Sequence, residues 1–256
     1  MMIEELYNKI KAMPGADALA LAGSRASGSS DEKSDYDIYI YCDELITDDV
    51  RREFIEPLCS YAEIGNKYFE SEDNVVLKDG TYVDIIYRRI EDFERGLSMT
   101  LDSHIARNGY STCFWHNIRT SSIIFDKSGR LTKLVERAQC DYPRELKAAI
   151  IKKNMELLHG FIPSYDKQIT KAYYRHDFVS VNHRTAAFLE SYFDVIFAVN
   201  EMTHPGEKRL VQLCKRDCKI LPANFEENLI LLFDNMFEYD VSDILENIVD
   251  ELKKVV

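Results

Sequence analysis

Residues 18–41 read ALALAGSRASGSSDEKSDYDIYIY, and this stretch decides the fold of the first part of the chain. It begins with a short apolar segment, Ala18 to Ala22, which is typical of a buried strand and ends at Gly23-Ser24. It closes with Asp35 to Tyr41, whose aromatic and β-branched residues favour a second strand. The stretch therefore predicts a strand, a glycine corner, a loop and another strand.

The loop that opens at Gly23-Ser24 has the composition of an anion-binding loop. Small residues let backbone N–H groups approach an anion closely, and a helix that follows such a loop adds the partial positive charge of its N-terminus. A surface loop without a ligand has the same composition. Both interpretations stay open on this feature alone.

Two aspartates stand at the mouth of the second strand. Asp35 and Asp37 are separated by one residue, so both side chains lie on one face of a strand, with about 7 Å between their Cα atoms. Aspartate is a poor strand residue, and a bound hard cation would explain two of them at this place. The alternative is a solvated strand edge.

A third acid, Asp84, stands inside an apolar segment. Residues 74–87 predict a hairpin, because Asp79-Gly80 supplies the backbone conformation of a tight turn. A carboxylate in an apolar strand is costly unless it is paired, hydrogen-bonded or bound to a metal. It is either a core aspartate held by Arg88 or Arg89, or a member of one site with the two earlier aspartates. The second interpretation requires its strand to pack beside theirs.

The order of these motifs resembles the nucleotidyltransferase superfamily, which has the DNA polymerase β-like fold. In that family a hydrophobic residue and Gly-Ser are followed by an Asp-x-Asp pair and by a third carboxylate on a later strand. The matching residues are Ala22-Gly23-Ser24, Asp35-Tyr36-Asp37 and Asp84.

The remainder of the chain is similar to bacterial adenylyltransferases that modify aminoglycosides and lincosamides, and to relatives with a similar helical domain. This similarity is carried by Tyr174-Arg175-His176-Asp177, by Ala198-Val199-Asn200 and by the segment from His204 to Lys208.

The resemblance implies an α+β fold of two domains. A mixed-sheet nucleotidyltransferase domain of the polymerase β type would occupy residues 1–140, and an all-α helical bundle that binds substrate would occupy residues 141–256. The hydrophobic pattern agrees, since strand-like runs alternate with helices before Asp141-Tyr142-Pro143 and helical periodicity dominates after it. Within the first domain, a last strand is expected at 122–125 and helices near 2–13, 47–61, 90–101 and 130–139.

The resemblance also implies roles for individual residues. The carboxylates that would act as catalytic residues and metal ligands are Asp35, Asp37 and Asp84, the last either as a ligand of a second metal ion or as the group that accepts the proton of the acceptor hydroxyl. The residues that would hold the nucleotide phosphates are Gly23, Ser24, Arg25 and Lys208. The residues that would contact the acceptor are Asp177 and Glu207.

The implied activity is Mg²⁺-dependent transfer of a nucleoside monophosphate to a hydroxyl of a small molecule, possible acceptors being compounds like aminoglycoside or lincosamide antibiotics. The implied cofactor is Mg²⁺, as two ions, and the co-substrate is ATP or another nucleoside triphosphate, with AMP as the expected group transferred. Two alternatives stay open. One is a nucleotide-binding or antitoxin-like regulatory protein with the same fold, and the other is a nucleotidyltransferase that acts on a protein or on tRNA.

Composition narrows the class of partner. The chain has 32 basic and 44 acidic residues, a net charge of −12, which weighs against a nucleic-acid partner. Its six cysteines form no Cys-x-x-Cys pair, as expected for reduced thiols in a cytoplasmic protein. No apolar run approaches the roughly 18 residues of a membrane span, and the acidic N-terminus does not resemble a secretory signal. We expect a cytoplasmic protein with small-molecule partners and no membrane association.

Overall fold

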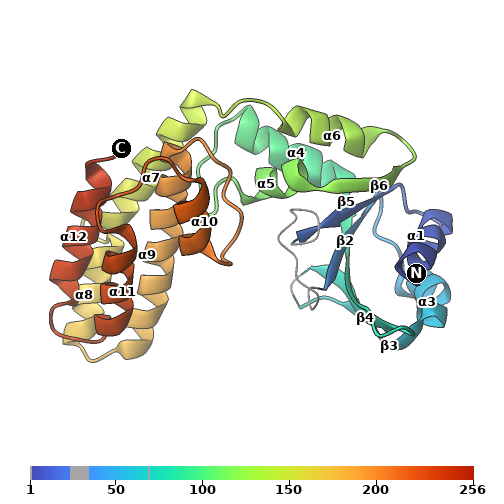
Figure 1. Ribbon diagram of the computed structural model, residues 1–256, viewed down its shortest axis with the longest axis horizontal. Helices are drawn as coiled ribbons and strands as arrows, with labels where there is room; N and C mark the ends of the chain where they lie inside the picture. The colour runs from blue at the N-terminus through green and yellow to red at the C-terminus, as the bar shows by residue number, and fades with distance from the viewer. Residues whose placement is uncertain (1, 24–34, 69) are drawn as a thin grey trace. The chain divides into compact units, whose positions relative to one another are not determined.

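The computed structural model describes residues 2–23, 35–68 and 70–256 (Figure 1). The chain forms two compact units. One contains the residues up to Ser98 together with Asn117–Cys140, and the other contains Met99–His116 together with Asp141–Val256. The boundary between them runs through α4 (Ile90–Leu101) and α5 (Cys113–Thr120). The segment 99–116 thus belongs to the same unit as the C-terminal helices.

The first unit is built on a mixed sheet of six strands, which is part of the expected α+β fold. The strands are β1 (Ala18–Ala22), β2 (Tyr36–Cys42), β3 (Cys59–Asn66), β4 (Ser71–Leu77), β5 (Tyr82–Arg89) and β6 (Ser122–Asp126). Their order across the sheet is β3-β4-β5-β2-β1-β6. The β2 and β5 strands pair in parallel, and the other neighbours pair antiparallel.

One face of this sheet carries the hydrophobic core of the unit. Ile38 and Ile40 of β2 and Val83 and Ile85 of β5 are buried in it, against α1 (Met2–Ala12) and α3 (Asp48–Ile55) (Figure 1). Burial of each such side chain contributes about 1.5–3 kcal/mol. A shift of either strand by one residue would expose all its core residues, so this burial fixes the strand register.

The opposite face of the same strands is more polar. In β1 it carries only alanines, and Ala20 and Ala22 lie beside Tyr39 and Asp37 of β2. Because side chains alternate along a strand, the residues between the core positions of β2 and β5 all lie on this face. The core therefore determines which face receives Asp37 and Asp84.

The expected hairpin is confirmed, and one expected helix is too long. The N–H of Leu77 donates to the carbonyl of Thr81 at 2.8 Å, and Gly80 has a φ of +87° in the turn. The helix expected over 47–61 ends at Ile55, is followed by the short 3₁₀ helix η1 (Glu56–Leu58), and gives way to β3. Pro57 cannot continue the helical hydrogen bonds, and β3 is held by its pairing with β4.

The second unit is helical, and this confirms the all-α character expected after residue 140. Its helices are α7 (Arg144–His159), α8 (Tyr165–Tyr174), α9 (Phe178–Val199), α10 (Leu210–Asp217), α11 (Phe225–Asn235) and α12 (Val241–Lys253). The last helix of the first unit is α6 (Arg130–Ala138). None of the helices in the described ranges combines the length and apolar character that a membrane crossing requires.

A buried polar cluster holds the segment 99–116 in the helical unit. Asp194 on α9 is 1% exposed and accepts hydrogen bonds from the backbone N–H of Ser111 and from Nδ2 of Asn154, both at 3.0 Å. Asn154 on α7 also accepts from the N–H of Gly109 at 3.0 Å. These bonds satisfy a carboxyl group that would otherwise be costly to bury.

We expect the stability of this unit to depend on the ionisation of Asp194. Burial raises the pKa of its carboxyl to about 6, against a weaker opposing effect of the hydrogen bonds from Ser111 and Asn154. A raised pKa means that the folded state binds the proton more tightly than the unfolded state. Stability contributed by Asp194 should therefore fall by about 2 kcal/mol as the pH rises from 4 to 6.

Urea unfolding of the wild type and of Asp194→Asn at these two pH values measures this effect. The difference in unfolding free energy between the wild type and Asp194→Asn should change by about 2 kcal/mol from pH 4 to pH 6. The control is Asp234→Asn, which removes an exposed carboxylate from α11 of the same unit. A pH dependence that is the same in the wild type and Asp194→Asn would contradict the assignment.

Candidate active site

Two of the three predicted carboxylates occupy facing positions in the sheet. Asp37 on β2 and Asp84 on β5 are register partners in the parallel pair of strands. Neighbouring strands lie about 4.8 Å apart, and partner residues point to the same face. The structure therefore brings together two acids that are far apart in the sequence, on the face opposite the hydrophobic core.

Gly23 lies directly against the carboxylate of Asp37. It follows β1, whose last residue, Ala22, is the register partner of Asp37. A Cβ atom on Gly23 would overlap Oδ2 of Asp37 and would lie 2.8 Å from its Cγ. The φ of +63° at this position also favours glycine. The glycine corner and the strand carboxylate form one site.

The remaining residues of the two motifs are placed as follows. Asp35 is exposed and lies immediately before β2, two residues from Asp37. Ser24 and Arg25 lie outside the described residues. The first unit thus presents Gly23, Asp37 and Asp84 at one place, with Asp35 at the entry to the same strand.

Asp84 is held by an amide and not by the arginines that follow it. Nδ2 of Asn74, its register partner on β4, donates to Oδ1 of Asp84 at 2.9 Å. Arg88 and Arg89 pair with other acids, Arg88 with Glu70 at 2.8 Å. The idea that either arginine holds Asp84 as a core ion pair is therefore wrong.

Arg88 instead stabilises the face that carries the acids. Its Nε and Nη2 donate to the two carboxylate oxygens of Glu70 at 3.0 and 2.8 Å, and its Nη1 donates to Oδ1 of Asn117 at 2.9 Å. The guanidinium lies 3.8 Å from the ring centroid of Tyr39, a cation–π contact. All these contacts fix the side chain in place, which leaves Arg88 a structural role beside the site.

A further acid, Glu72, lies on the same face. It is two residues from Asn74 on β4 and only 9% exposed. Burial raises the pKa of its carboxyl, and the negative charge of Asp84 raises it further. A face that gathers this much acidic character favours the binding of a cation.

The donor set suits magnesium with a phosphate ligand. Magnesium in proteins is usually held by one or two carboxylates together with substrate phosphates and water. Asp37 and Asp84 provide two carboxylates on one face, and Gly23 leaves the space next to Asp37 free of a side chain. Within residues 2–23, 35–68 and 70–256, no group of three or more His, Cys, Asp or Glu side chains could hold a metal ion by itself. The arrangement fits an ion that arrives with its phosphate ligands.

The predicted residues of the helical unit lie on its surface. Glu207 and Lys208 are exposed in the turn before α10. Asp177 is the N-cap of α9, where its Oδ1 accepts from the backbone N–H of Ser180 at 3.1 Å. The hydrogen bonds from Ser180 lower the pKa of Asp177. Helix capping gives Asp177 a structural role without any ligand.

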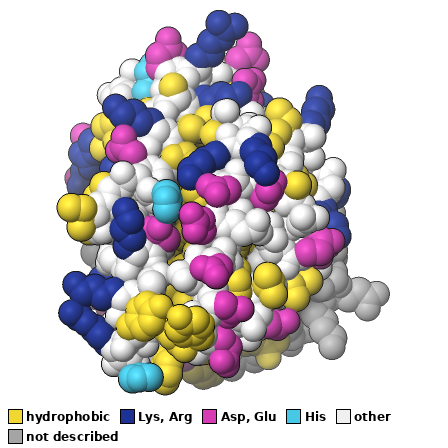
Figure 2. All heavy atoms as spheres, turned by 90° about the vertical axis from the view of Figure 1, so that its left-hand side faces the viewer, with side chains coloured by type: hydrophobic (Ala, Val, Ile, Leu, Met, Phe, Trp, Pro, Cys, Tyr) yellow, Lys and Arg dark blue, Asp and Glu magenta, His cyan; other side chains and the backbone are white. Residues whose placement is uncertain are grey.

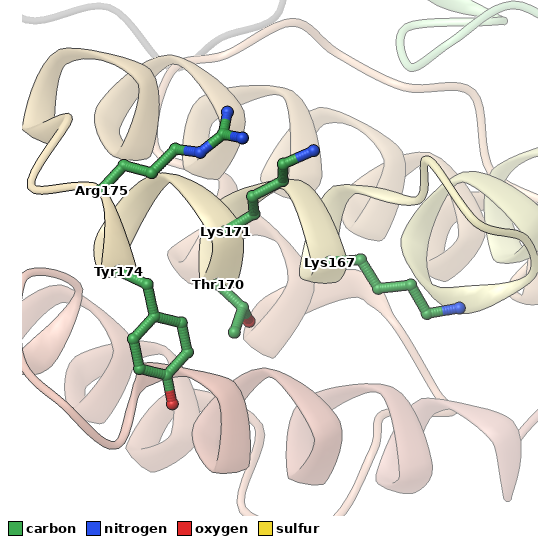
Figure 3. A pocket seen from close by; sticks show the side chains of 5 residues that line it. All are labelled: Lys167, Thr170, Lys171, Tyr174 and Arg175. Carbon is green, nitrogen blue, oxygen red and sulfur yellow. The ribbon is translucent and has the colours of Figure 1, made fainter.

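The helical unit also has a basic groove of about 440 Å³. Four residues of α8 and the residue that follows this helix line the groove: Lys167, Thr170, Lys171, Tyr174 and Arg175 (Figure 3). Lys171 and Arg175 point to one side of the helix, and Tyr174 and Thr170 point to the other (Figure 3). Of the predicted catalytic and nucleotide-binding residues that the structure describes, none lines this groove.

The face of the molecule drawn in Figure 2 mixes acidic, basic and hydrophobic side chains, and hydrophobic ones gather toward its lower part. Exposed aromatic residues of the helical unit contact one another in pairs. The ring centroids of Tyr174 and Tyr239 are 6.3 Å apart, and those of Phe178 and Phe237 are 5.7 Å apart. These pairs lie within the second unit and include none of the predicted site residues.

Asn74 and Glu72 were not predicted as site residues, although the sequence contains a signal for both. A hairpin closed by Leu77 and Thr81 places each residue opposite a partner that can be counted back from the turn. Counting back in this way pairs Asn74 with Asp84, as the structure has it. Glu72, two residues earlier, then falls on the same face.

No protein-family model and no curated protein matches this sequence. Several solved structures are similar to this chain, among them three whose matches cover 98% of it. A nucleotidyltransferase-like protein from Exiguobacterium sibiricum 255-15 has a TM-score of 0.44 and 11% identity, and the match covers 98% of this chain and 72% of that one.

A spectinomycin adenyltransferase from Enterococcus faecialis, crystallised with ATP and spectinomycin, has a TM-score of 0.33 and 14% identity, with 98% and 99% of the two chains covered. An aminoglycoside 6-adenyltransferase from Bacillus subtilis has a TM-score of 0.31 and 10% identity, with 98% and 89% covered. By name, all three are nucleotidyltransferases or nucleotidyltransferase-like proteins.

Proposed function

We propose that the protein transfers a nucleoside monophosphate, with AMP from ATP as the first expectation, to a hydroxyl group of a small molecule in a Mg²⁺-dependent reaction. One observation carries the proposal. Asp37 and Asp84 are register partners on one face of the sheet, and the glycine corner after β1 lies against Asp37. Carboxylate oxygens and an open backbone are the groups that commonly bind a cation together with its phosphates.

In this reaction one P–O bond forms between the acceptor oxygen and the α-phosphorus, and the P–O bond to pyrophosphate breaks. The hydroxyl proton passes to a carboxylate or to water. The protein contributes positioning and electrostatic stabilisation more than covalent chemistry. Mg²⁺ held at this site would neutralise phosphate charge and assist deprotonation of the attacking hydroxyl.

The residues of the chain have distinct parts in this scheme. Asp35 and Asp37 would bind the metal ions, and Asp84, the register partner of Asp37, would complete the second metal site. Gly23 would leave room for the phosphates next to Asp37, with Ser24 and Arg25 from the segment that follows. Contact of Lys208 with the triphosphate, and of Asp177 and Glu207 with the acceptor, is also part of the proposal.

Two measurements on the full chain test the proposal. The first is pyrophosphate release from ATP across a panel of hydroxyl-bearing small molecules, with and without Mg²⁺. The second is calorimetric binding of a non-hydrolysable ATP analogue, which we expect to be at least about tenfold tighter with Mg²⁺. Analogue binding that ignores Mg²⁺ would reject the proposed site and would favour the regulatory alternative.

Gly23→Ala tests the glycine corner. The added methyl group must displace the carboxylate of Asp37 or the backbone that carries it, and a displacement of about 1 Å lowers turnover by about a hundredfold. The matched control is Gly80→Ala. Gly80 also has a positive φ, of +87°, but a Cβ there meets nothing within 4 Å. Turnover should fall in Gly23→Ala only, and equal turnover in the two variants would show that the corner is not part of the site.

A further inference from the structure

The side chain of Asp84 stands at the end of a chain of hydrogen bonds that begins at the backbone. The N–H of Tyr68 donates to Oδ1 of Asn66 at 3.0 Å, and Nδ2 of Asn66 donates to Oδ1 of Asn74 at 2.9 Å. Nδ2 of Asn74 then donates to Oδ1 of Asp84 at 2.9 Å. Three strands, β3, β4 and β5, thus contribute to one relay that ends at a predicted metal ligand.

The backbone donor fixes the direction of the whole relay. A backbone N–H only donates, so Oδ1 of Asn66 must face Tyr68 and its NH₂ group must face Asn74. The carbonyl oxygen of Asn74 must then accept, and its NH₂ group must face Asp84. The last acceptor of the relay is the carboxylate oxygen Oδ1 of Asp84.

We propose that Asn74, oriented by Asn66, is a positioning residue that presents the carboxylate of Asp84 as a metal ligand. The amide of Asn74 donates to Oδ1 and holds the carboxylate in one rotamer. The direction of the second oxygen, Oδ2, is thereby fixed as well. This inference rests on the proposed function, and it concerns the role of Asp84 as a metal ligand.

The geometry explains why an amide is suited to this position. Asn74 and Asp84 are register partners in an antiparallel pair, so their side chains lie next to each other on one face. An apolar residue at 74 would leave Oδ1 without its donor, and an aspartate would place a second negative charge beside it. Outer partners of metal ligands typically contribute a factor of 10–100 in metal affinity or activity.

The test uses Mn²⁺ together with a non-hydrolysable ATP analogue as the probe, with binding of the ion followed by electron paramagnetic resonance. Asn74→Ala should weaken Mn²⁺ binding by a factor of about 10–100, and Asn66→Ala should weaken it by less, because the donor to Asp84 remains but loses its orientation. The matched control is Val76→Ala, which shortens the next side chain on the same face of β4. That variant should bind Mn²⁺ within about twofold of the wild type.

A second readout separates positioning from general damage. If Asn74 acts through the metal ligand Asp84, the turnover of Asn74→Ala should recover at high Mg²⁺. A high Mg²⁺ concentration would not restore the turnover of a misfolded protein. Wild-type affinity for Mn²⁺ in both asparagine variants would overturn the relay and leave the proposed function standing. A wild type that binds neither Mn²⁺ nor Mg²⁺-nucleotide would overturn the proposed function itself.

Discussion

Asp37→Asn is expected to lower Mg²⁺-dependent pyrophosphate release by about a thousandfold or more. The substitution keeps the size of the side chain, so it still fits against Gly23, but it removes the negative charge that would attract the cation. Because Asp37 and Asp84 are register partners, the loss also halves the carboxylate pair on this face. The initial rate of release with saturating ATP and acceptor measures the effect.

The control for this variant is Asp92→Asn, in the same unit. Asp92 lies on α4, is half-exposed, and pairs with Arg95 one helical turn away, so its removal tests the loss of one surface carboxylate. Thermal unfolding should show that both variants remain folded at the assay temperature. Asp37→Asn with turnover within tenfold of the wild type would exclude Asp37 from the reaction.

The helical unit is expected to lose stability in acid through a buried histidine, His204. Its side chain is fully buried between the rings of Tyr110 and Phe197, with centroid distances of 4.9 and 4.8 Å. Nδ1 accepts a hydrogen bond from the N–H of Gly206 at 3.1 Å. Burial lowers the pKa of His204 to about 3, and the neighbouring His116 lowers it further.

The direction of the effect follows from this depressed pKa. At a pH below about 6.5, the ordinary pKa of histidine, His204 binds a proton in the unfolded chain but not in the folded chain. Stability contributed by neutral His204 is therefore complete above that pH and is lost as the pH falls. Between pH 7 and pH 4 the loss amounts to about 3 kcal/mol.

The measurement is urea unfolding followed by the fluorescence of Trp115, the single tryptophan, which is buried in this unit. The wild type should lose about 3 kcal/mol more than His204→Gln between pH 7 and pH 4. Asp194 changes stability in the opposite direction over this range, and the comparison of two proteins cancels its contribution. The control is His183→Gln, which removes an exposed histidine of α9 and should follow the wild type. Parallel pH profiles of the wild type and His204→Gln would contradict the assignment.

Local signals were sufficient for the elements that surround the site. The alternation in residues 36–42, the Asp-Gly turn at 79–80 and the helical periodicity after residue 140 are each decided by residues close in sequence. The strand β3 could not be predicted in this way. Its residues have no strong strand pattern, and it forms because β4, several residues later, offers a partner edge.

The sequence by itself indicated a binding site at the acids at the start of β2 and inside β5. Carboxylates are costly in these places unless something binds them. The parallel pairing of β2 with β5, whose register places Asp37 opposite Asp84, was decided only by the tertiary structure. The burial of Ile38 and Ile85 on the other face fixes that register, and this burial depends on the packing of α1 and α3 against the sheet. The donor to Asp84 was likewise decided by the pairing of three strands, since a hydrogen bond needs both partners in place.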